Sequence, residues 1–385
     1  MKSVFYLSWN FIGNGKRLWI LPAILIACSV IVMIQISSIS RGFNTELMKK
    51  IMFTSSHIEI KAEGARGFPG YEGAAEDFRE NEEIKAASPR FVSETVLSND
   101  NYSSGVRIIG IIPEHEMEIS RHLKHLLLNL PEKNWIIVGD VLFNQMKLKL
   151  GDTVNLKGFN GSSDFKVSGT FSVGLYEYDL SFAYVNLSES QTLFNYEGIA
   201  SSINIILHDI NKTKKFENFF ESRNPGIEAK TWLERNKSLV GTMKIEEFVM
   251  KIIFFLTSFL SLIGVSLLIF VNINERKELI GQLEINGMSK FRIRMIFLME
   301  GIIIVFSGLI GGVFLGIFLG KLLGNLKLDL PVEISMTYGA NFLPVVINYN
   351  DIYFIVLSTI IFSFILLYFI TGKILRLDIE KLLKN

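Results

Sequence analysis

Four long apolar stretches constrain this chain more than any other feature of its sequence. The first covers 18–39, and the others follow at 252–271, 301–323 and 352–370, with about two hundred mostly polar residues between the first and the second. Each stretch has about the ~20 residues that a helix needs to cross a ~30 Å hydrocarbon core. The pattern predicts a chain that enters a membrane, builds a domain outside it and returns for three further passes.

The predicted fold class is a membrane protein with four transmembrane helices, arranged one plus three, and a large α+β extracytoplasmic domain between helices 1 and 2. A mean hydropathy of +0.35 suits such a chain. The expected segments are a cytoplasmic N-terminal lead (1–17), transmembrane helix 1 (18–40), the outer α+β domain with helical stalks (41–250), transmembrane helix 2 (251–272), a cytoplasmic coupling region (273–294), transmembrane helix 3 (295–324), an outer loop (325–350), transmembrane helix 4 (351–371) and a cytoplasmic tail (372–385).

Local periodicity gives the expected elements of the outer domain. Helical spacing continues from the first apolar stretch through 41–50 and returns at 228–250, which predicts a stalk helix on each side of the domain. The Gly-rich segment 63–73 is expected to be a mobile loop. Strands are predicted at 57–61, 91–97, 106–112, 135–138, 153–156, 165–173, 182–185 and 203–207, and helices at 80–87, 115–128, 141–148, 188–194 and 212–221.

Basic residues of the short segments set the orientation. Lys and Arg are frequent before the first apolar stretch, between the second and third, and after the fourth, whereas Lys327 alone lies between the third and fourth. Cytoplasmic loops carry this excess of positive charge. Both termini and the loop at 272–294 are therefore predicted to be cytoplasmic, and the large domain lies outside.

Charge and cysteine content exclude several classes of protein. A formal net charge of +1 gives no field that would attract nucleic acid, and the lone Cys28 excludes an internal disulfide framework. Residues 16–28 imitate the end of a lipoprotein signal peptide, but the apolar run continues to position 39, twice the length of a signal core. A small residue in a membrane helix is the favoured interpretation of Cys28.

No motif for catalysis is present. The sequence has no phosphate-binding loop, Gly-x-Ser-x-Gly nucleophile or His-Glu-x-x-His zinc helix. We therefore expect no catalytic residue, no metal and no enzyme activity, so the energy for any work comes from another subunit. His115, Glu118, His122 and His125 would share one face of a helix, which fits a metal site or, as we favour, a solvated face.

The third apolar stretch carries glycines at every fourth position. Small residues at this spacing let two membrane helices approach closely, so a helix-packing stripe is predicted, with the neighbour either in this chain or in another. Glu300 lies inside the same apolar run, and it either pairs with a basic residue or sits at interface depth near Arg294. The stripe consists of Gly308, Gly312, Gly316, Gly320 and Gly324.

The cytoplasmic loop at 274–301 is too apolar for a solvated connector. It reads as a charged helix, a break at Gly287 and a second amphipathic helix that enters the third apolar stretch. Its apolar residues include Leu279, Ile280, Leu283, Met288, Phe291 and Ile293. A partner that docks at this loop is implied.

This loop resembles the coupling region of ABC-transporter permeases of the MacB, FtsX and lipoprotein-release type, within which the permeases LolC and LolE are the most similar. The order of one span, a large outer domain and three spans is also that family's. The matching pieces in this sequence are Ile280, Leu283, Gly287-Met288-Ser289, Ile296-Phe297 and Glu300-Gly301, together with Arg41-Gly42-Phe43, Ser88-Pro89-Arg90, Val138-Gly139, Gly151-Asp152 and Gly174 to Asp179.

Two features depart from the family pattern. Leu279 stands where an acidic residue is usual, with Glu278 beside it, and Glu284 stands where a basic residue is usual. Contact with an ATPase would therefore differ in its charge pairing. The segment 157–166 is too short for the hairpin hook with which LolC-type chains hold a periplasmic chaperone, which makes the chain more like LolE.

The resemblance implies the permease subunit of an ABC transporter in the bacterial inner membrane, with its large domain in the periplasm. It would extract lipoproteins for a periplasmic carrier, driven by a cytoplasmic ATPase dimer that binds ATP and Mg. Further implied partners are a second permease copy or paralogue, a lipoprotein chaperone and membrane lipid. The implied ATPase-docking residues are Glu278, Ile280, Leu283, Glu284, Gly287, Met288, Ser289 and Phe291. The implied lipoprotein-binding residues are Val30, Met33, Ile34, Phe254, Phe255, Phe259 and Leu262.

Two alternatives stand beside this interpretation. A MacB-like subunit would export a peptide or toxin without passing it through the membrane. An FtsX-like subunit would transmit ATPase motion to an external cell-wall hydrolase, although the outer domain of such regulators is usually smaller.

Overall fold

The computed structural model describes residues 20–62, 67–159, 161–372 and 374. The predicted N-terminal lead, and the predicted tail apart from residues 372 and 374, lie outside them. Packing divides the chain into two units. The helical unit comprises 1–43, 243–328 and 343–385, and the α/β unit comprises 44–242 and 329–342.

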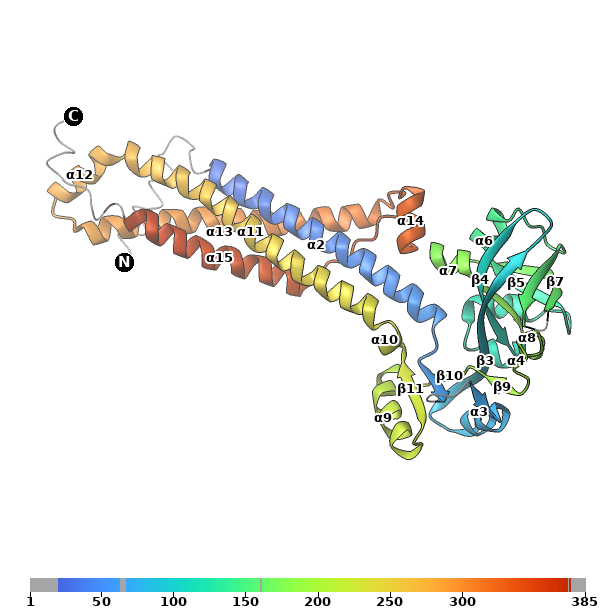
Figure 1. Ribbon diagram of the computed structural model, residues 1–385. Coiled ribbons are helices and arrows are strands. Elements are labelled where there is room, and N and C mark those ends of the chain that lie inside the picture. Colours follow the sequence, from blue (N-terminus) through green and yellow to red (C-terminus); the bar gives the residue numbers. More distant parts are fainter. Residues whose placement is uncertain (1–19, 63–66, 160, 373, 375–385) are drawn as a thin grey trace. The chain divides into compact units, whose positions relative to one another are not determined.

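Among the described residues, four helices are long and apolar enough to cross a membrane (Figure 1). They are α2 (Ile20–Thr54), α11 (Lys237–Glu275), α13 (Lys290–Asn325) and α15 (Tyr349–Thr371), and the short α12 (Lys277–Ile285) connects α11 to α13. This arrangement confirms the predicted fold class, with the α/β unit between the first and second of the four. The first two helices also extend beyond their apolar stretches, as the helical periodicity predicts.

The core of the helical unit is built from one face of each long helix. On α2 the buried side chains Ile26, Val30, Met33 and Ile34 recur at the spacing that places residues on one side of a helix. They meet buried residues of the other three helices, including Phe254, Val265, Phe297, Val305, Leu309, Ile355 and Leu367. The opposite faces of these helices carry many exposed apolar side chains, as expected for surfaces that contact lipid.

A mixed nine-stranded sheet forms the α/β unit, in the order β11-β1-β10-β3-β4-β8-β5-β7-β6. The pairs β4–β8 and β5–β7 are parallel and all other pairs are antiparallel. The strands are β1 (Ile58–Ala62), β3 (Ile84–Ser98), β4 (Ser103–Ile111), β5 (Trp135–Gly139), β6 (Thr153–Gly158), β7 (Gly161–Phe171), β8 (Phe182–Asn186), β10 (Ser202–Leu207) and β11 (Ile227–Thr231), and β2 (Phe68–Pro69) pairs separately with β9 (Ile199–Ala200).

The long strand β3 belongs to two parts of this sheet. Its first half, from Ile84 to Arg90, pairs with β10, and its second half, from Phe91 to Ser98, pairs with β4. Leu97 and Ser98 also pair with β6. The six strands β3, β4, β8, β5, β7 and β6, in this spatial order, therefore close into a ring. The ring encloses fully buried side chains such as Ile108, Ile136 and Leu156.

Short helices cover the sheet. They are α3 (Tyr71–Glu80), α4 (Pro113–Glu116), η1 (Arg121–Leu123), α5 (Lys124–Leu127), α6 (Asp140–Gln145), α7 (Tyr176–Ser181), α8 (Leu187–Phe194), η2 (Ile210–Lys212), α9 (Thr213–Arg223), α10 (Trp232–Arg235) and α14 (Val332–Tyr338). The last of these comes from the loop between α13 and α15, and its segment, 329–342, joins the α/β unit although residues 243–328 separate it from the rest of that unit.

Several predictions about local structure are wrong. Residues 84–87 belong to β3 rather than to a helix, because their backbone pairs with β10. The predicted loop at 63–73 contains β2 and the start of α3, while 63–66 lie outside the described residues. The predicted second stalk begins later than expected, since 227–231 form β11 at the edge of the sheet, against β1.

Candidate functional site

The turn between α12 and α13 is built by a glycine. Gly287 has φ +84°, a left-handed conformation that side chains resist, and a Cβ on it would meet nothing within 4 Å. Met288 N–H donates to Leu283 O at 3.0 Å, and Gly287 N–H donates to Glu284 O at 3.0 Å. This pair of bonds is the Schellman arrangement that ends helices. The Gly-Met pair of the sequence therefore sets the direction in which the chain enters α13.

The predicted ATPase-docking residues divide into a buried and an exposed set. Ile280 is 1% exposed, and Leu283 and Met288 pack against the same core, so their positions favour holding the turn in place over contacting a partner. Phe291 is 62% exposed, whereas Glu284 lies 3.7 Å from the ammonium of Lys290. Glu278, Gly287 and Ser289 are also exposed.

Ile285 is an exposed apolar residue of this turn that the sequence-based set omitted. It is 61% exposed at the end of α12. Five positions separate it from Ile280, which turns it well away from the buried face. The spacing of the two isoleucines is therefore a sequence signal that Ile285 lies away from the buried face of the helix. An apolar pair, Ile285 and Phe291, is therefore presented where the predicted partner would dock.

Two arginines hold the long helices together near the turn at Gly287. Arg276 Nη1 lies 3.7 Å from Glu300 Oε1, so this carboxylate pairs with a basic residue, which is one of the two arrangements expected. The guanidinium of Arg294 lies 4.2 Å above the centre of the Tyr368 ring and donates to Tyr368 O at 2.7 Å. The first contact joins the start of the loop to α13, and the second joins α13 to α15.

The glycine stripe of α13 faces a neighbour in the same chain. A Cβ on Gly308 would lie 2.7 Å from Ala23 O, and one on Gly312 would lie 2.9 Å from Ala27 O, both on α2. Gly316 faces Ile34 in the same way. Gly320 and Gly324 instead face Ile347 and Val345 of the segment that precedes α15. The close approach of α2 and α13 thus depends on the missing side chains.

Most predicted lipoprotein-binding residues are committed to this packing. Val30, Met33, Ile34, Phe254 and Leu262 are at most 3% exposed, and Val30 and Ile34 contact the glycines of α13. Phe255 and Phe259 are 46% and 38% exposed, and both contact the Phe362 ring edge-on at centroid distances of 4.6 and 6.1 Å. Of the seven predicted residues, Phe255 and Phe259 therefore present a large exposed surface, and the other five are buried.

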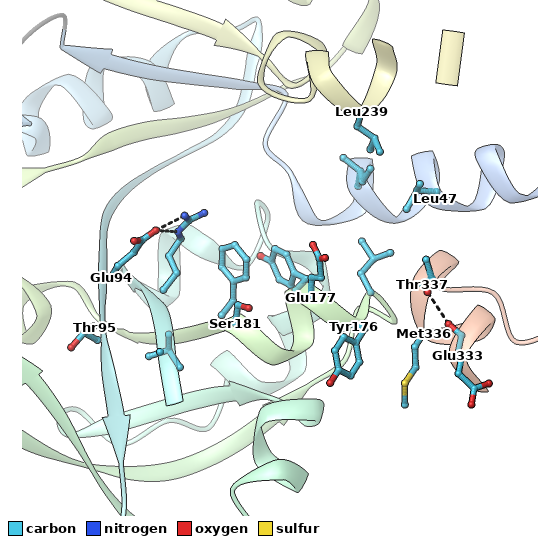
Figure 2. A pocket seen from close by; sticks show the side chains of 17 residues that line it. Leu47, Glu94, Thr95, Tyr176, Glu177, Ser181, Leu239, Glu333, Met336 and Thr337 are labelled. Atoms are coloured by element: carbon cyan, nitrogen blue, oxygen red, sulfur yellow. Dashed lines mark hydrogen bonds and ion pairs between the residues drawn. The ribbon is translucent and has the colours of Figure 1, made fainter. Parts of the chain in front are cut away.

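A cavity of about 1030 Å³ in the α/β unit was not predicted (Figure 2). No sequence signal marked it, because its walls come from segments that are far apart in the chain. The residues that line it are Leu47, Ile51, Glu94, Thr95, Gly105, Val106, Arg107, Leu175, Tyr176, Glu177, Tyr178, Ser181, Phe182, Leu239, Glu333, Met336 and Thr337.

One wall of this cavity is an ordered stack of side chains. Arg107 lies over the Phe182 ring at 5.5 Å, and the Phe182 ring stacks on Tyr178 at 4.1 Å with 12° between the planes. Glu94 holds Arg107 from the other side through the guanidinium. The opposite wall is aliphatic and comes from Leu47, Ile51 and Leu239 at the ends of α2 and α11.

A buried polar network supports the stack from behind. The hydroxyls of Tyr178 and Tyr184 lie 2.7 Å apart, and Tyr184 also lies 3.4 Å from His122 Nε2. Burial, and to a lesser extent the charge of Arg90, lowers the pKa of His122 to about 4. Arg90 in turn pairs with Glu116, which is fully buried and also accepts from Ser88 and Ser120.

The four residues considered for a metal site do not share a helix. Met117 to Ser120 separate α4 from η1, so the predicted helix at 115–128 is broken. His115 bonds to Arg79, Glu118 pairs with Lys85 and Lys124, and His122 is buried among aromatic rings. Within the described part of the chain, no group of three or more His, Cys, Asp or Glu side chains is placed to hold a metal ion.

Two short pieces of the family pattern meet in the α/β unit. Asp179 accepts hydrogen bonds from the N–H groups of Val173 and Gly174, at 2.8 and 2.9 Å, while burial raises its pKa. A Cβ on Gly139 would strike the carbonyl of Asp179. The backbone of Gly139 therefore packs directly against the backbone of Asp179. This contact and the hydrogen bonds of Asp179 hold α7 in place beside the cavity.

A comparison with protein families matches the later long helices together with the turn at Gly287. Residues 251–379, which include α12, the Gly287 turn and the glycine stripe, match the family described as FtsX-like permease C-terminal. The chain carries an FtsX-like permease domain. That domain contains both the exposed pair Ile285 and Phe291 and the exposed phenylalanines of α11.

Relatives named for lipoprotein release cover most of the chain. It is 23% identical to the lipoprotein-releasing system transmembrane protein LolC of Xylella fastidiosa over 362 residues, covering 88% of this chain and 87% of that protein. It is 22% identical to LolC of Neisseria meningitidis over 374 residues, with the same coverage, and 27% identical to LolE of Haemophilus influenzae over 221 residues, which cover 51% of this chain and 53% of that protein.

The prediction that the chain is more similar to LolE than to LolC depends on the short segment 157–166. In the structure β6 and β7 pair up to Gly158 and Gly161, so two residues separate the strands, too few for an inserted hairpin. Relatives named LolC nevertheless span more of the chain than LolE of Haemophilus influenzae does. The length of this segment therefore does not separate the two groups for this chain.

Solved structures of periplasmic and extracellular domains resemble part of the chain. The periplasmic region of MacB from Actinobacillus actinomycetemcomitans is 12% identical with a TM-score of 0.35, covering 50% of this chain and 97% of that one. The extracellular domain of the noncanonic ABC-type transporter YknZ from Gram-positive bacteria is 13% identical with a TM-score of 0.34, covering 45% of this chain and 99% of that one.

Proposed function

We propose that this chain is the permease subunit of an ABC transporter that extracts lipoproteins from the bacterial inner membrane and passes them to a periplasmic carrier. The similarity to LolC over 88% of the chain, which includes an FtsX-like permease domain, carries the proposal. In this arrangement the α/β unit lies in the periplasm, and the turn between α12 and α13 lies in the cytoplasm, where basic residues are frequent.

A separate cytoplasmic ATPase dimer supplies the energy, binds ATP and Mg, and docks on the turn at Gly287. Its contact surface consists of the exposed side chains Ile285 and Phe291 with Glu278 and Ser289 around them. Apolar side chains at the centre of a polar rim are the usual anatomy of a protein interface. The buried Ile280 and the partly buried Leu283 and Met288 act indirectly, because they transmit a push on the turn into the core of the helical unit.

Acyl chains of the cargo bind at the exposed face of α11 around Phe255 and Phe259. An apolar surface is required there because each CH₂ that moves from lipid into water costs ~0.8 kcal/mol. A second permease, either a copy of this chain or a paralogue, supplies the other side of the path. The five buried residues of the predicted set keep α2 and α11 in position rather than contacting cargo.

Site-specific photo-crosslinking tests the proposal. A photoreactive amino acid at Phe255 or Phe259 should form an adduct with a lipoprotein in cells that contain the complex, and ATP turnover should reduce it. The matched control is Leu260, which is 67% exposed on another side of the same helix and should give lipid adducts instead. If no lipoprotein adduct forms at position 255 or 259 in an active complex, the proposed cargo is refuted.

A further inference from the structure

The cavity of the α/β unit has no part in the proposed function. It is large, its lining is mostly apolar, and its end at α14 is formed by Met336 and Thr337 (Figure 2). We propose that this cavity binds a single aliphatic chain that carries a neutral or cationic end group. Identification of that chain as an acyl chain of the cargo, held outside the membrane, rests on the proposed function. The preference for an aliphatic chain does not.

Size and lining fit such a ligand. Pockets for small ligands measure about 300–1,000 Å³ and are mostly apolar with a few polar groups. This cavity is at the upper end of that range, at about 1030 Å³. Figure 2 shows Leu47 and Leu239 on the other side of the lining from Tyr176 of α7, and Ile51 and Phe182 also line the cavity. An aliphatic chain would therefore contact both aliphatic and aromatic side chains.

The aromatic wall is fixed before a ligand arrives. Arg107 is held between Glu94 and the Phe182 ring, and Phe182 stacks on Tyr178, whose hydroxyl is bonded to Tyr184. Side chains that are already immobilised lose little entropy when a ligand binds. The wall is therefore a preformed surface rather than a set of loose side chains.

An extended peptide fits this cavity less well than an aliphatic chain. Peptides that bind along sheets use free backbone groups of an edge strand. Here Val106 and Arg107 of β4 are already paired with β3 on one side, and Arg107 is also paired with β8 on the other. The neighbouring wall, α7, is a helix. The cavity thus offers side chains where a peptide would need hydrogen-bond partners.

Charge decides which end group is accepted. Among the described residues that line the cavity, Arg107 is the one base, and Glu94 neutralises it. Glu177 and Glu333 add negative charge to the same lining. A carboxylate or phosphate on the ligand would be repelled by these groups, whereas an amine or an uncharged group would not.

Photolabelling of the full-length protein in nanodiscs, without ATPase or lipoprotein, tests the site. The probes are palmitylamine, palmityl alcohol and palmitic acid, each with a diazirine in the chain, and adducts are mapped by mass spectrometry. The amine and the alcohol should label peptides that contain α7 and α14, and the acid should label them less. Glu177→Gln should raise labelling by the acid.

Two substitutions on one helix separate the cavity from the bilayer. Met336→Glu should reduce labelling of α7 by about tenfold, because a carboxylate would face the aliphatic chain. Ile334→Glu is the matched control, since Ile334 is 39% exposed and Met336 is 40% exposed on the same α14, and Ile334 is not among the lining residues. Met336→Leu should keep wild-type labelling.

Three results would overturn the proposal. They are adducts confined to the apolar spans, equal loss of labelling in both glutamate variants, and protection by an unlipidated peptide but not by unlabelled palmityl alcohol. Because the assay contains no ATPase and no cargo, it does not depend on the proposed function. A protein that labels at α7 and α14 but does not release lipoproteins would refute the proposed function and support the site.

Discussion

Arg41 of α2 and Asp351 in the first turn of α15 form a bidentate ion pair. Arg41 Nε and Nη2 donate to the two carboxylate oxygens at 3.0 and 2.9 Å, and Ser37 Oγ donates to the same carboxylate at 2.7 Å. The carboxylate also lies at a helix N-terminus, where the helix dipole favours negative charge. This contact fastens the first long helix to the last at one end of the helical unit.

We predict that Arg41→Ala lowers the stability of the helical unit by about 2 kcal/mol, because it removes charged hydrogen bonds from a carboxylate whose side chain is only 15% exposed. Arg41→Lys should recover part of this loss, since lysine cannot bond both oxygens in parallel. Thermal unfolding of the full chain in nanodiscs measures the effect. Lys49→Ala is the control, because the Lys49–Glu46 pair is exposed. Equal losses in both alanine variants would contradict the prediction.

The membrane architecture could be predicted from the sequence because the signal is one-dimensional. A helix that crosses lipid must satisfy its own backbone, so about twenty apolar residues in a row have few other uses. Strand periodicity likewise placed most strands of the α/β unit within a few residues. The ring closure by β6 and the recruitment of α14 into that unit depend on contacts across long sequence distances, which no local pattern contains.

The helix predicted at 115–128 shows how tertiary structure overrides local spacing. Leu123, Leu126 and Leu127 have helical spacing, but Glu116 is drawn into a buried pair with Arg90. Glu116 also accepts from Ser120, within the segment where the helix breaks. The partner of Glu116 lies on a distant strand, so no local pattern of residues marks the break.

The candidate sites were predictable to different extents. The turn at Gly287 was visible because a glycine between two amphipathic segments is the usual mark of a helix end. The exposure of Ile285 was missed although the sequence contains a signal for it, because five positions separate it from Ile280 and place the two on different faces of α12. The cavity was invisible because Leu47, Arg107, Tyr178 and Met336 come from four separate segments.

Gly312 should be required for the packing of α13 against α2, whereas its neighbour Gly311 should not. A Cβ on Gly312 would lie 2.9 Å from both Ala27 O and Val30 Cβ, whereas one on Gly311 would meet nothing within 4 Å. We predict that Gly312→Val lowers stability by about 1–3 kcal/mol through overpacking. Gly311→Val is the control on the same helix and should be close to neutral. The prediction fails if the two variants unfold at the same temperature in nanodiscs.

The proposed docking of the ATPase at the turn between α12 and α13 should depend on the exposed apolar pair Ile285 and Phe291. We predict that Ile285→Asp and Phe291→Asp each reduce co-purification of the ATPase several-fold without changing the unfolding temperature of the permease, because both side chains are more than 60% exposed. Ile280→Asp should lower the unfolding temperature as well, since it places a charge in the core. The control is Gln282→Ala, an exposed polar position on α12. Full recovery of ATPase with both aspartate variants would refute docking at this pair.

The backbone of the same turn can be tested without changing any contact. Gly287→Ala should destabilise the turn by about 1–2 kcal/mol, which is the cost of a left-handed conformation for a residue with a Cβ. Gly287→Asn should cost less, because asparagine tolerates this conformation better. Hydrogen exchange of α12 measures how far each substitution destabilises the turn, and a coupled ATPase assay of the complex measures the consequence for activity. If alanine and asparagine behave alike, the left-handed conformation is not what requires glycine.

Stability of the α/β unit should fall between about pH 6.5 and 4 because of His122. Its pKa is lowered from 6.5 to about 4, first by burial and then by Arg90, so the folded state holds the neutral ring while the unfolded chain takes up a proton. The stabilisation is therefore complete above pH 6.5 and is lost as the pH falls toward 4, by about 3 kcal/mol in total. Burial also lowers the pKa of His57, which adds a change in the same direction. Hydrogen exchange of β5 and β8 in the full chain, measured across this range, should show protection falling with pH. His122→Phe should flatten the profile, and a profile as steep as that of the wild type would exclude His122 as its cause.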